Sequence, residues 1–122
     1  MTAEKFRQLA LGLPEAVESA HMGHPDFRVR NKIFATLVPE SLRPGRRGAW
    51  GMVKLPPDHQ ESLILAHPDV FEPCNGAWGR AGATYIRLSA VKPAAARQAL
   101  ATAWRNTAPR SLVRQFDKFS VT

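Results

Sequence analysis

The short connections between residues 17 and 55 restrict the fold of this chain more than any other feature of its sequence. Within this segment Phe27 and Val29 alternate with arginines, the period-two pattern of a strand that has one apolar face and one charged face. A more buried strand is predicted over 33–38 and a further strand over 49–55. The connections are too short for the crossover that a parallel pair needs, so we predict an antiparallel meander.

Helical patterns precede and follow the meander. Apolar residues recur with helical spacing from Phe6 to Leu13, and Thr2 can cap the start, which predicts a helix over 3–11. The remaining predicted segments are a loop over 41–48, a helix over 56–66, an irregular glycine-rich stretch over 69–83, a strand over 84–88, a helix that begins at Pro93 and a short helix that begins at Pro109. This order predicts one α+β domain over residues 1–122, with an antiparallel sheet covered on one face by the N- and C-terminal helices.

Composition sets limits on cofactors and location. At 122 residues the chain can bury a core without a metal or a disulfide, and nothing in the sequence requires a cofactor. Its one cysteine, Cys74, excludes an intramolecular disulfide and is typical of a reducing cytoplasm. The longest apolar run, Leu63–Ala66, is far shorter than a membrane span, and the N-terminus has no signal-peptide pattern. We therefore predict a soluble, cytoplasmic protein; the sequence leaves its oligomeric state open, and a monomer is favoured.

Positive charge is concentrated in one part of the sequence. The chain carries 17 lysines and arginines against 10 aspartates and glutamates, a net charge of +7. Between residues 28 and 54 only Glu40 opposes seven basic residues, so almost all of the surplus lies in the meander. These seven are Arg28, Arg30, Lys32, Arg43, Arg46, Arg47 and Lys54.

This basic hairpin and loop have two interpretations. Strand alternation places Arg28 and Arg30 on a common face near the turn, and the loop 43–47 adds a flexible basic tip. Such a ribbon can follow phosphates and enter a major groove, which predicts binding of duplex DNA. Alternatively, the charges keep a solvated sheet face from pairing with the edges of other sheets.

The glycine-rich stretch 75–82 and the three tryptophans supply further candidates. The glycines lack the spacing of a dinucleotide-binding fingerprint or a P-loop, and they permit a compact loop in which Trp78 folds onto the domain. Alternatively, Trp78 and Arg80 face a groove, where one stacks on a ligand and the other binds phosphate, with His24 as a further groove residue. Trp104 is expected in the core, and Trp50, beside the basic loop, on the surface.

Histidines and nucleophiles do not form a recognisable metal or catalytic site. His21, His24 and Asp26 lie close in sequence, but on a strand the two histidines point to opposite faces unless the turn at Gly23 reorients them. A metal normally needs about three or four well-placed donors, so we favour a turn with local hydrogen bonds. Cys74 has no evident base partner, and we predict a protein without enzymatic activity.

Five stretches of the chain form a recognisable series. In order they are Leu13-Pro-Glu, His24-Pro-Asp with the residues that follow it to Leu37, Val53-Lys-Leu-Pro, Ala77-Trp-Gly-Arg80, and the segment from Ala103-Trp-Arg to Ala108-Pro-Arg. Together they resemble the MmcQ/YjbR-like family across nearly the whole chain. The resemblance implies a frataxin-like (CyaY-like) α+β fold and DNA binding through a "double wing" of sheet and loops. Ala83 lies where many relatives carry a bulky aromatic residue, so a groove lined by this position would be altered.

Two functions therefore stay open at this point. The first is a DNA-binding module that acts through the basic hairpin and loop, with Arg80 as a further contact. The second is a binding domain for a small anionic ligand or an acidic protein partner, held in a groove near Trp78 and Arg80.

DNA binding through the hairpin predicts a steep dependence of affinity on salt. The log–log slope is about −0.9 for each phosphate that the protein neutralises. Replacing Arg46 and Arg47 together by Ala should make the slope less steep by about one to two, as measured by fluorescence anisotropy of a labelled duplex at several salt concentrations. Absence of binding at low salt would contradict this prediction.

Overall fold

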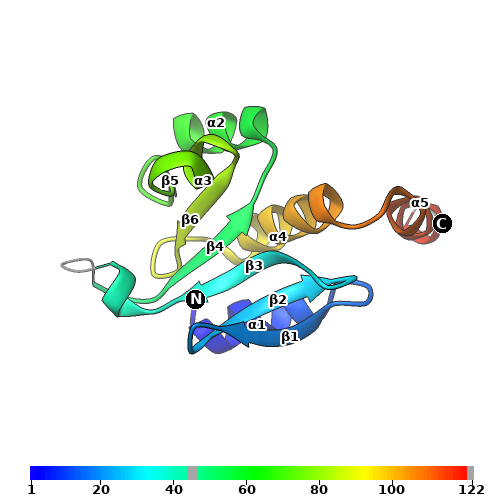
Figure 1. The fold of residues 1–122 in the computed structure, drawn as a ribbon. Coiled ribbons are helices and arrows are strands. Elements are labelled where there is room, and N and C mark those ends of the chain that lie inside the picture. The colour runs from blue at the N-terminus through cyan, green and yellow to red at the C-terminus, as the bar shows by residue number, and fades with distance from the viewer. Residues whose placement is uncertain (44–46, 121–122) are drawn as a thin grey trace.

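The computed structural model of the chain describes residues 1–43 and 47–120. In order its elements are α1 (Ala3–Leu11), β1 (Val17–His21), β2 (His24–Val29), β3 (Lys32–Val38), the 3-10 helix η1 (Glu40–Leu42), β4 (Trp50–Lys54), α2 (Pro57–Ala66), β5 (Phe71–Pro73), α3 (Gly76–Arg80), β6 (Ala83–Arg87), α4 (Pro93–Thr107) and α5 (Arg110–Ser120) (Figure 1). The predicted α+β class is confirmed. None of the helices in the described ranges is long and apolar enough to cross a bilayer.

All six strands belong to one antiparallel sheet, in the order β1-β2-β3-β4-β6-β5. The first four strands are neighbours in space as they are in sequence, which confirms the predicted meander. β6 then pairs with β4, and β5 forms the far edge. The register shifts between Phe27 and Arg28, where β2 pairs with β3.

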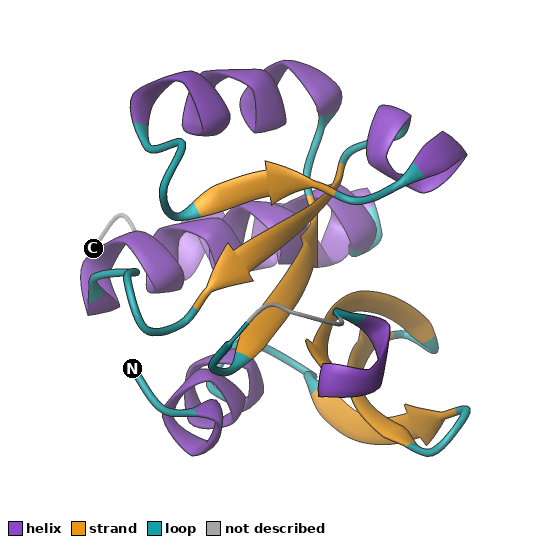
Figure 2. Cartoon of the chain, turned by 90° about the vertical axis from the view of Figure 1, so that its left-hand side faces the viewer, coloured by secondary structure: helices purple, strands orange, loops and turns teal. Residues whose placement is uncertain are grey.

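Helices α1 and α4 cover one face of this sheet, packing on the central strands β3 and β4 (Figure 1, Figure 2). The core between them includes Phe6, Phe34 and Trp104, all fully buried. The Trp104 indole donates a hydrogen bond to the Pro14 carbonyl (2.9 Å) and meets the Phe116 ring of α5 edge-on, with 5.1 Å between centroids. The predicted core position of Trp104 and the predicted covering of one sheet face are both confirmed.

The stretch 69–83 departs from the sequence prediction, because it contains strand β5 and helix α3 instead of irregular loop alone. Two glycines allow the backbone to approach itself closely here. A Cβ at Gly79 would lie 1.7 Å from the Cys74 carbonyl oxygen, and one at Gly82 would lie 1.7 Å from that of Leu55. The buried Gln60 amide of α2 then donates to the carbonyls of Gly79 and Ala83, at 3.0 Å each. These contacts fix α3 against the sheet.

The close approach at Gly82 predicts a large loss of stability in Gly82→Ala. Its φ of +116° disfavours any side chain, and the added Cβ meets backbone that cannot rotate away. We expect a loss of about 3 kcal/mol or more in the free energy of unfolding, measured by urea denaturation. Gly23→Ala is the matched control, because Gly23 has a φ of +83° but open space around it. This control should lose only about 1 kcal/mol, and equal losses in both variants would contradict the packing argument.

Candidate binding groove on the open face of the sheet

The sheet face opposite α1 and α4 carries the candidate site. Directly paired residues of neighbouring strands point to the same face, so the register identifies one row across this surface. The row consists of Asp26, Thr36, Met52, Tyr85 and Glu72, from β2, β3, β4, β6 and β5. The open face thus mixes charged, polar and apolar side chains, in contrast to the apolar face beneath the helices.

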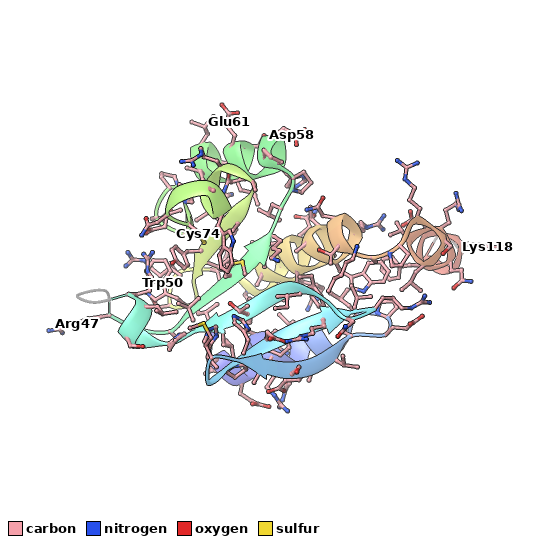
Figure 3. The ribbon with its side chains drawn as sticks, in the orientation of Figure 1. Arg47, Trp50, Asp58, Glu61, Cys74 and Lys118 are labelled. Atoms are coloured by element: carbon pink, nitrogen blue, oxygen red, sulfur yellow. The ribbon has the colours of Figure 1, made fainter. Side chains whose placement is uncertain are left out.

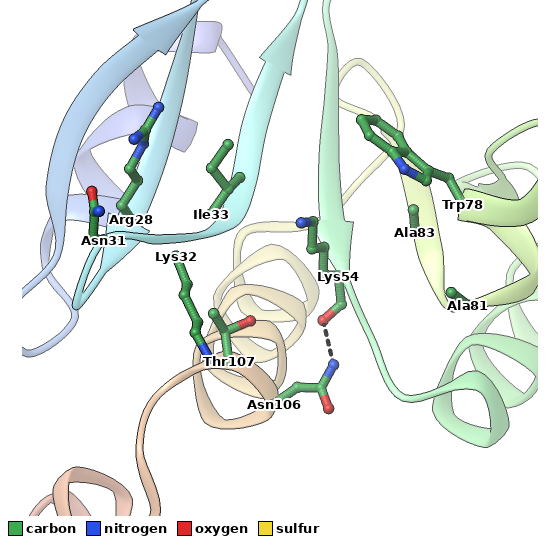
Figure 4. Close-up of a pocket in the computed structure, with 10 residues that line it drawn as sticks. All are labelled: Arg28, Asn31, Lys32, Ile33, Lys54, Trp78, Ala81, Ala83, Asn106 and Thr107. Atoms are coloured by element: carbon green, nitrogen blue, oxygen red, sulfur yellow. Dashed lines mark hydrogen bonds between the residues drawn. The ribbon is translucent and has the colours of Figure 1, made fainter.

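Two adjoining hollows open at this face: one extends past the end of β4 to the end of α4, and the other lies over the strands. The first, here the basic groove, has a volume of about 660 Å³, and its lining includes Arg28, Asn31, Lys32, Lys54, Trp78 and Asn106 (Figure 4). The second, here the apolar pocket, has a volume of about 500 Å³, and its lining includes Met22, His24, Val38, Leu42, Met52 and Tyr85. Ile33, Lys54 and Trp78 line both, so the two hollows share a wall.

The basic groove has an excess of positive charge. None of the ten described residues that line it is acidic. Lys32 is exposed and Lys54 is half-buried, and neither forms an ion pair with a carboxylate of the described residues. The Asn106 side chain of α4 donates to the Lys54 carbonyl (3.1 Å), which joins the end of that helix to the groove (Figure 4).

Arg28 also lines the groove, but its charge is balanced. Its guanidinium donates to both carboxylate oxygens of Asp26, at 2.8 and 3.0 Å, and the Asp26 side chain is fully buried. His21 Nδ1 lies 2.7 Å from the same carboxylate. The hydrogen bonds from Arg28 hold the pKa of Asp26 below its usual value, against the effect of burial. Asp26 therefore stays ionised and orients Arg28.

Arg30 is balanced as well, and it does not lie on the strand with Arg28. It occupies the turn after β2 with a φ of 49°, so the expected common face of the two arginines was wrong. Its guanidinium donates to both oxygens of Glu15, at 2.5 and 2.9 Å. These hydrogen bonds lower the pKa of Glu15 and favour its charged form.

Arg43 lies inside the domain and is not part of an exposed tip. Only 9 % of its side chain is exposed, and it forms an ion pair of 2.8 Å with Glu72. Its guanidinium carbon lies 4.2 Å from the centroid of the Trp50 ring and 4.0 Å from that of Tyr85. Trp50 is 3 % exposed, so the expectation that it lies on the surface was also wrong. Arg43 stabilises this aromatic cluster.

The other predicted cations have different positions. Arg47 is exposed and points away from the molecule (Figure 3), and Arg46 lies outside the described residues. Arg80 is exposed on α3 but lines neither hollow. Of the predicted basic residues, the basic groove therefore brings together Arg28, Lys32 and Lys54.

Of the three residues that the groove hypothesis named, Trp78 lines both hollows, His24 lines only the apolar pocket, and Arg80 lines neither. Trp78 is 65 % exposed, so it is not folded onto the domain as the alternative interpretation had it. The turn at Met22 and Gly23 reorients the histidines, and the rings of His21 and His24 meet edge-on with 4.2 Å between centroids. Within residues 1–43 and 47–120, no three His, Cys, Asp or Glu side chains gather as metal ligands.

Cys74 lies at the wall of the apolar pocket. Burial raises the pKa of its thiol to about 11, while a hydrogen bond with Tyr85 acts in the opposite direction. The thiol is therefore protonated near neutral pH and is a weak nucleophile.

Sequence reasoning missed several residues that shape this face. Asn106 and Thr107 come from the end of α4 and close one side of the basic groove. They are the last two residues of a helix that the sequence predicts, but no local pattern indicates that this helix ends beside β4. Met52 and Tyr85 are strand residues whose alternation was visible, but alternation alone does not reveal which face the helices leave open.

Comparison with known proteins identifies a family. A family model described as YjbR matches residues 11–106. No curated protein matches the sequence. Among solved structures, the crystal structure of Deinococcus radiodurans protein DR2400, with the family-model domain DUF419, aligns with a TM-score of 0.67 and 19 % identity. The alignment covers 84 % of this chain and 75 % of that chain, and at this identity it supports the fold alone.

The buried Asp26 predicts a stability difference that depends on pH. Asp26→Asn removes the charged acceptor of the Arg28 hydrogen bonds, and we expect it to lower the free energy of unfolding by about 2 kcal/mol at pH 7. The folded-state pKa lies below the unfolded value of about 3.9, so the contribution of the carboxylate is complete above that value. It is lost as pH falls through the folded-state pKa. Urea denaturation at pH 7 and at successively lower pH should show the two proteins converging, and a constant difference would contradict this account.

Proposed function

This chain belongs to the YjbR family, and we propose that it is a non-enzymatic binding domain for a small anionic ligand held in the basic groove. The observation that carries the proposal is the charge of that groove. Lys32 and Lys54 have no carboxylate partner among the described residues, and no described lining residue is acidic. A hollow that is lined by positive side chains and has walls of low dielectric constant concentrates anions from solution.

The remaining wall of the groove suits a ligand larger than a simple ion. The exposed Trp78 ring can cover a planar or apolar part of a ligand, and the Asn31 amide and Thr107 hydroxyl can donate to oxygen atoms. The volume of about 660 Å³ falls within the ordinary range for ligand sites of about 300–1,000 Å³. A phosphate or carboxylate on an organic group fits this combination.

The ion pairs of three arginines in the basic hairpin and loop favour ligand binding in the basic groove over DNA binding by the hairpin. Arg28, Arg30 and Arg43 each have a carboxylate partner within the domain. A phosphate that approached them would compete with that partner, and their contribution to counterion release would be small. Among the described cations of the hairpin and loop, Lys32, Arg47 and Lys54 then have no carboxylate partner, and of these only the two lysines line the groove.

Duplex DNA is the second candidate, and one observation favours it. Arg47 and Arg80 are exposed and, like the groove lysines, have no ion-pair partner among the described residues. Four unbalanced cations in a chain of net charge +7 are a suitable basis for phosphate contacts.

Binding of inorganic pyrophosphate, measured by calorimetry at low salt, tests the first candidate. We expect Lys32→Ala and Lys54→Ala each to weaken the affinity about tenfold, because each removes a charged donor worth about 1.5 kcal/mol or more. Lys5→Ala is the matched control, because Lys5 is an exposed lysine on α1, across the sheet from the groove. Its affinity should equal that of the unmodified protein.

Two further variants, at the exposed arginines, separate the two candidates. A duplex that loses affinity in Arg47→Ala and Arg80→Ala, with no binding of pyrophosphate to the unmodified protein, would favour DNA. Absence of binding to both probes at low salt would contradict both candidates.

A further inference from the structure

Exposed apolar side chains gather around the mouth of the apolar pocket. Met22 is 95 % exposed, Leu42 is 57 % exposed and Trp78 is 65 % exposed, and all three line this pocket. They form three of the five large hydrophobic side chains that are exposed in the described part of the chain. Contiguous apolar surface of this kind usually marks a site of interaction.

The polar groups of the pocket wall are mostly engaged or covered. His21 Nδ1 is held by Asp26, and the Tyr85 hydroxyl interacts with the Cys74 thiol. His24 Nδ1 has no hydrogen-bond partner among the described residues, and the atom is buried. The pocket surface that remains comes chiefly from Val38, Met52 and the exposed rim. An apolar group that entered it would leave the interactions of His21 with Asp26 and of Tyr85 with Cys74 intact.

The wall that the two hollows share sets their relation. Ile33, Lys54 and Trp78 line both, so the two hollows are adjacent, and a ligand that crosses these residues would occupy both. Lys54 would then hold the charged end at the boundary while the Trp78 ring covers the adjoining apolar part. A ligand that filled only one hollow would not explain why the exposed Trp78 ring lies between the lysines of the groove and the apolar pocket.

We infer that the ligand is an amphipathic anion, with its charged group at Lys32 and Lys54 and an apolar chain or ring in the apolar pocket. This inference rests on the proposed function and adds the chemical class of the ligand. A nucleotide fits less well, because the edge of its base needs several hydrogen-bond partners, whereas most of the pocket surface is apolar and Asn75 is one of the few polar side chains exposed there.

A series of n-alkyl phosphates tests the inference, with butyl, hexyl, octyl and decyl members below their micelle concentrations. Affinity should rise about fourfold for each methylene that enters the pocket, the equivalent of about 0.8 kcal/mol. Inorganic phosphate serves as the head group alone. AMP is the nucleotide comparison, and AMP that binds more tightly than hexyl phosphate would overturn the inference.

Variants assign the two ends of the ligand. Val38→Asn should flatten the increase with chain length and leave the affinity for inorganic phosphate unchanged, whereas Lys54→Ala should weaken every member by a similar factor. Leu42→Asn is a second pocket variant, because its exposed position carries little risk to folding. Lys5→Ala should leave the whole series unchanged.

The outcomes distinguish this inference from the proposed function. If inorganic phosphate binds through Lys32 and Lys54 but affinity does not rise with chain length, the amphipathic ligand is wrong and the anion site stands. If neither pyrophosphate nor any member of the series binds at low salt, both are wrong; if pyrophosphate alone binds, only the amphipathic ligand is wrong. If sedimentation shows a dimer that Leu42→Asn dissociates, the exposed rim belongs to an interface between two copies of the chain, and the inference is overturned.

Discussion

Helix α4 packs across β3 and β4 at the centre of the sheet, with α1 beside it, and this contact decides what each other surface can do. Because the sheet has one covered face, the alternating side chains of every strand divide into a buried set and an open set. The buried set is apolar and holds the fully buried Trp104 and Phe34. The open set is free to carry charge and to form hollows, so the candidate site is a direct consequence of the one-sided packing.

The positive charge that is available to a ligand depends on which cations have ion-pair partners, and not on how many cations there are. In the sequence seven cations crowd into residues 28–54, yet Arg28, Arg30 and Arg43 have partners within the domain. Two of these arginines have structural roles: Arg28 is held by the buried Asp26 carboxylate, and Arg43 stacks on the rings of Trp50 and Tyr85. The surplus that can act on a ligand is therefore smaller than the sequence suggests. It is also better localised, with Lys32 and Lys54 on neighbouring strands.

Features that depend on residues close together in the sequence were predicted correctly, and features that depend on distant residues were not. Alternation and short connections depend on neighbouring residues, so the meander and the long helices were predictable. Strand β5 has three residues and helix α3 has five, which is too short for a period to appear. Arg43 was misjudged because its partner Glu72 lies on the edge strand β5, far from it in the sequence. The groove lies between the β2–β3 turn and the end of α4, which are far apart in the sequence, so no local pattern could predict it.

The glycine contacts beneath α3 have a consequence for recognition. Gly79 and Gly82 bring the backbone against the Cys74 and Leu55 carbonyls, and the Gln60 amide ties the same segment to α2. Trp78 thus stands on an anchored support although its ring is exposed to solvent. A ligand that stacks on this ring does not have to order the segment that carries it. The entropy of that segment is already lost during folding, so more of the contact energy is available as affinity.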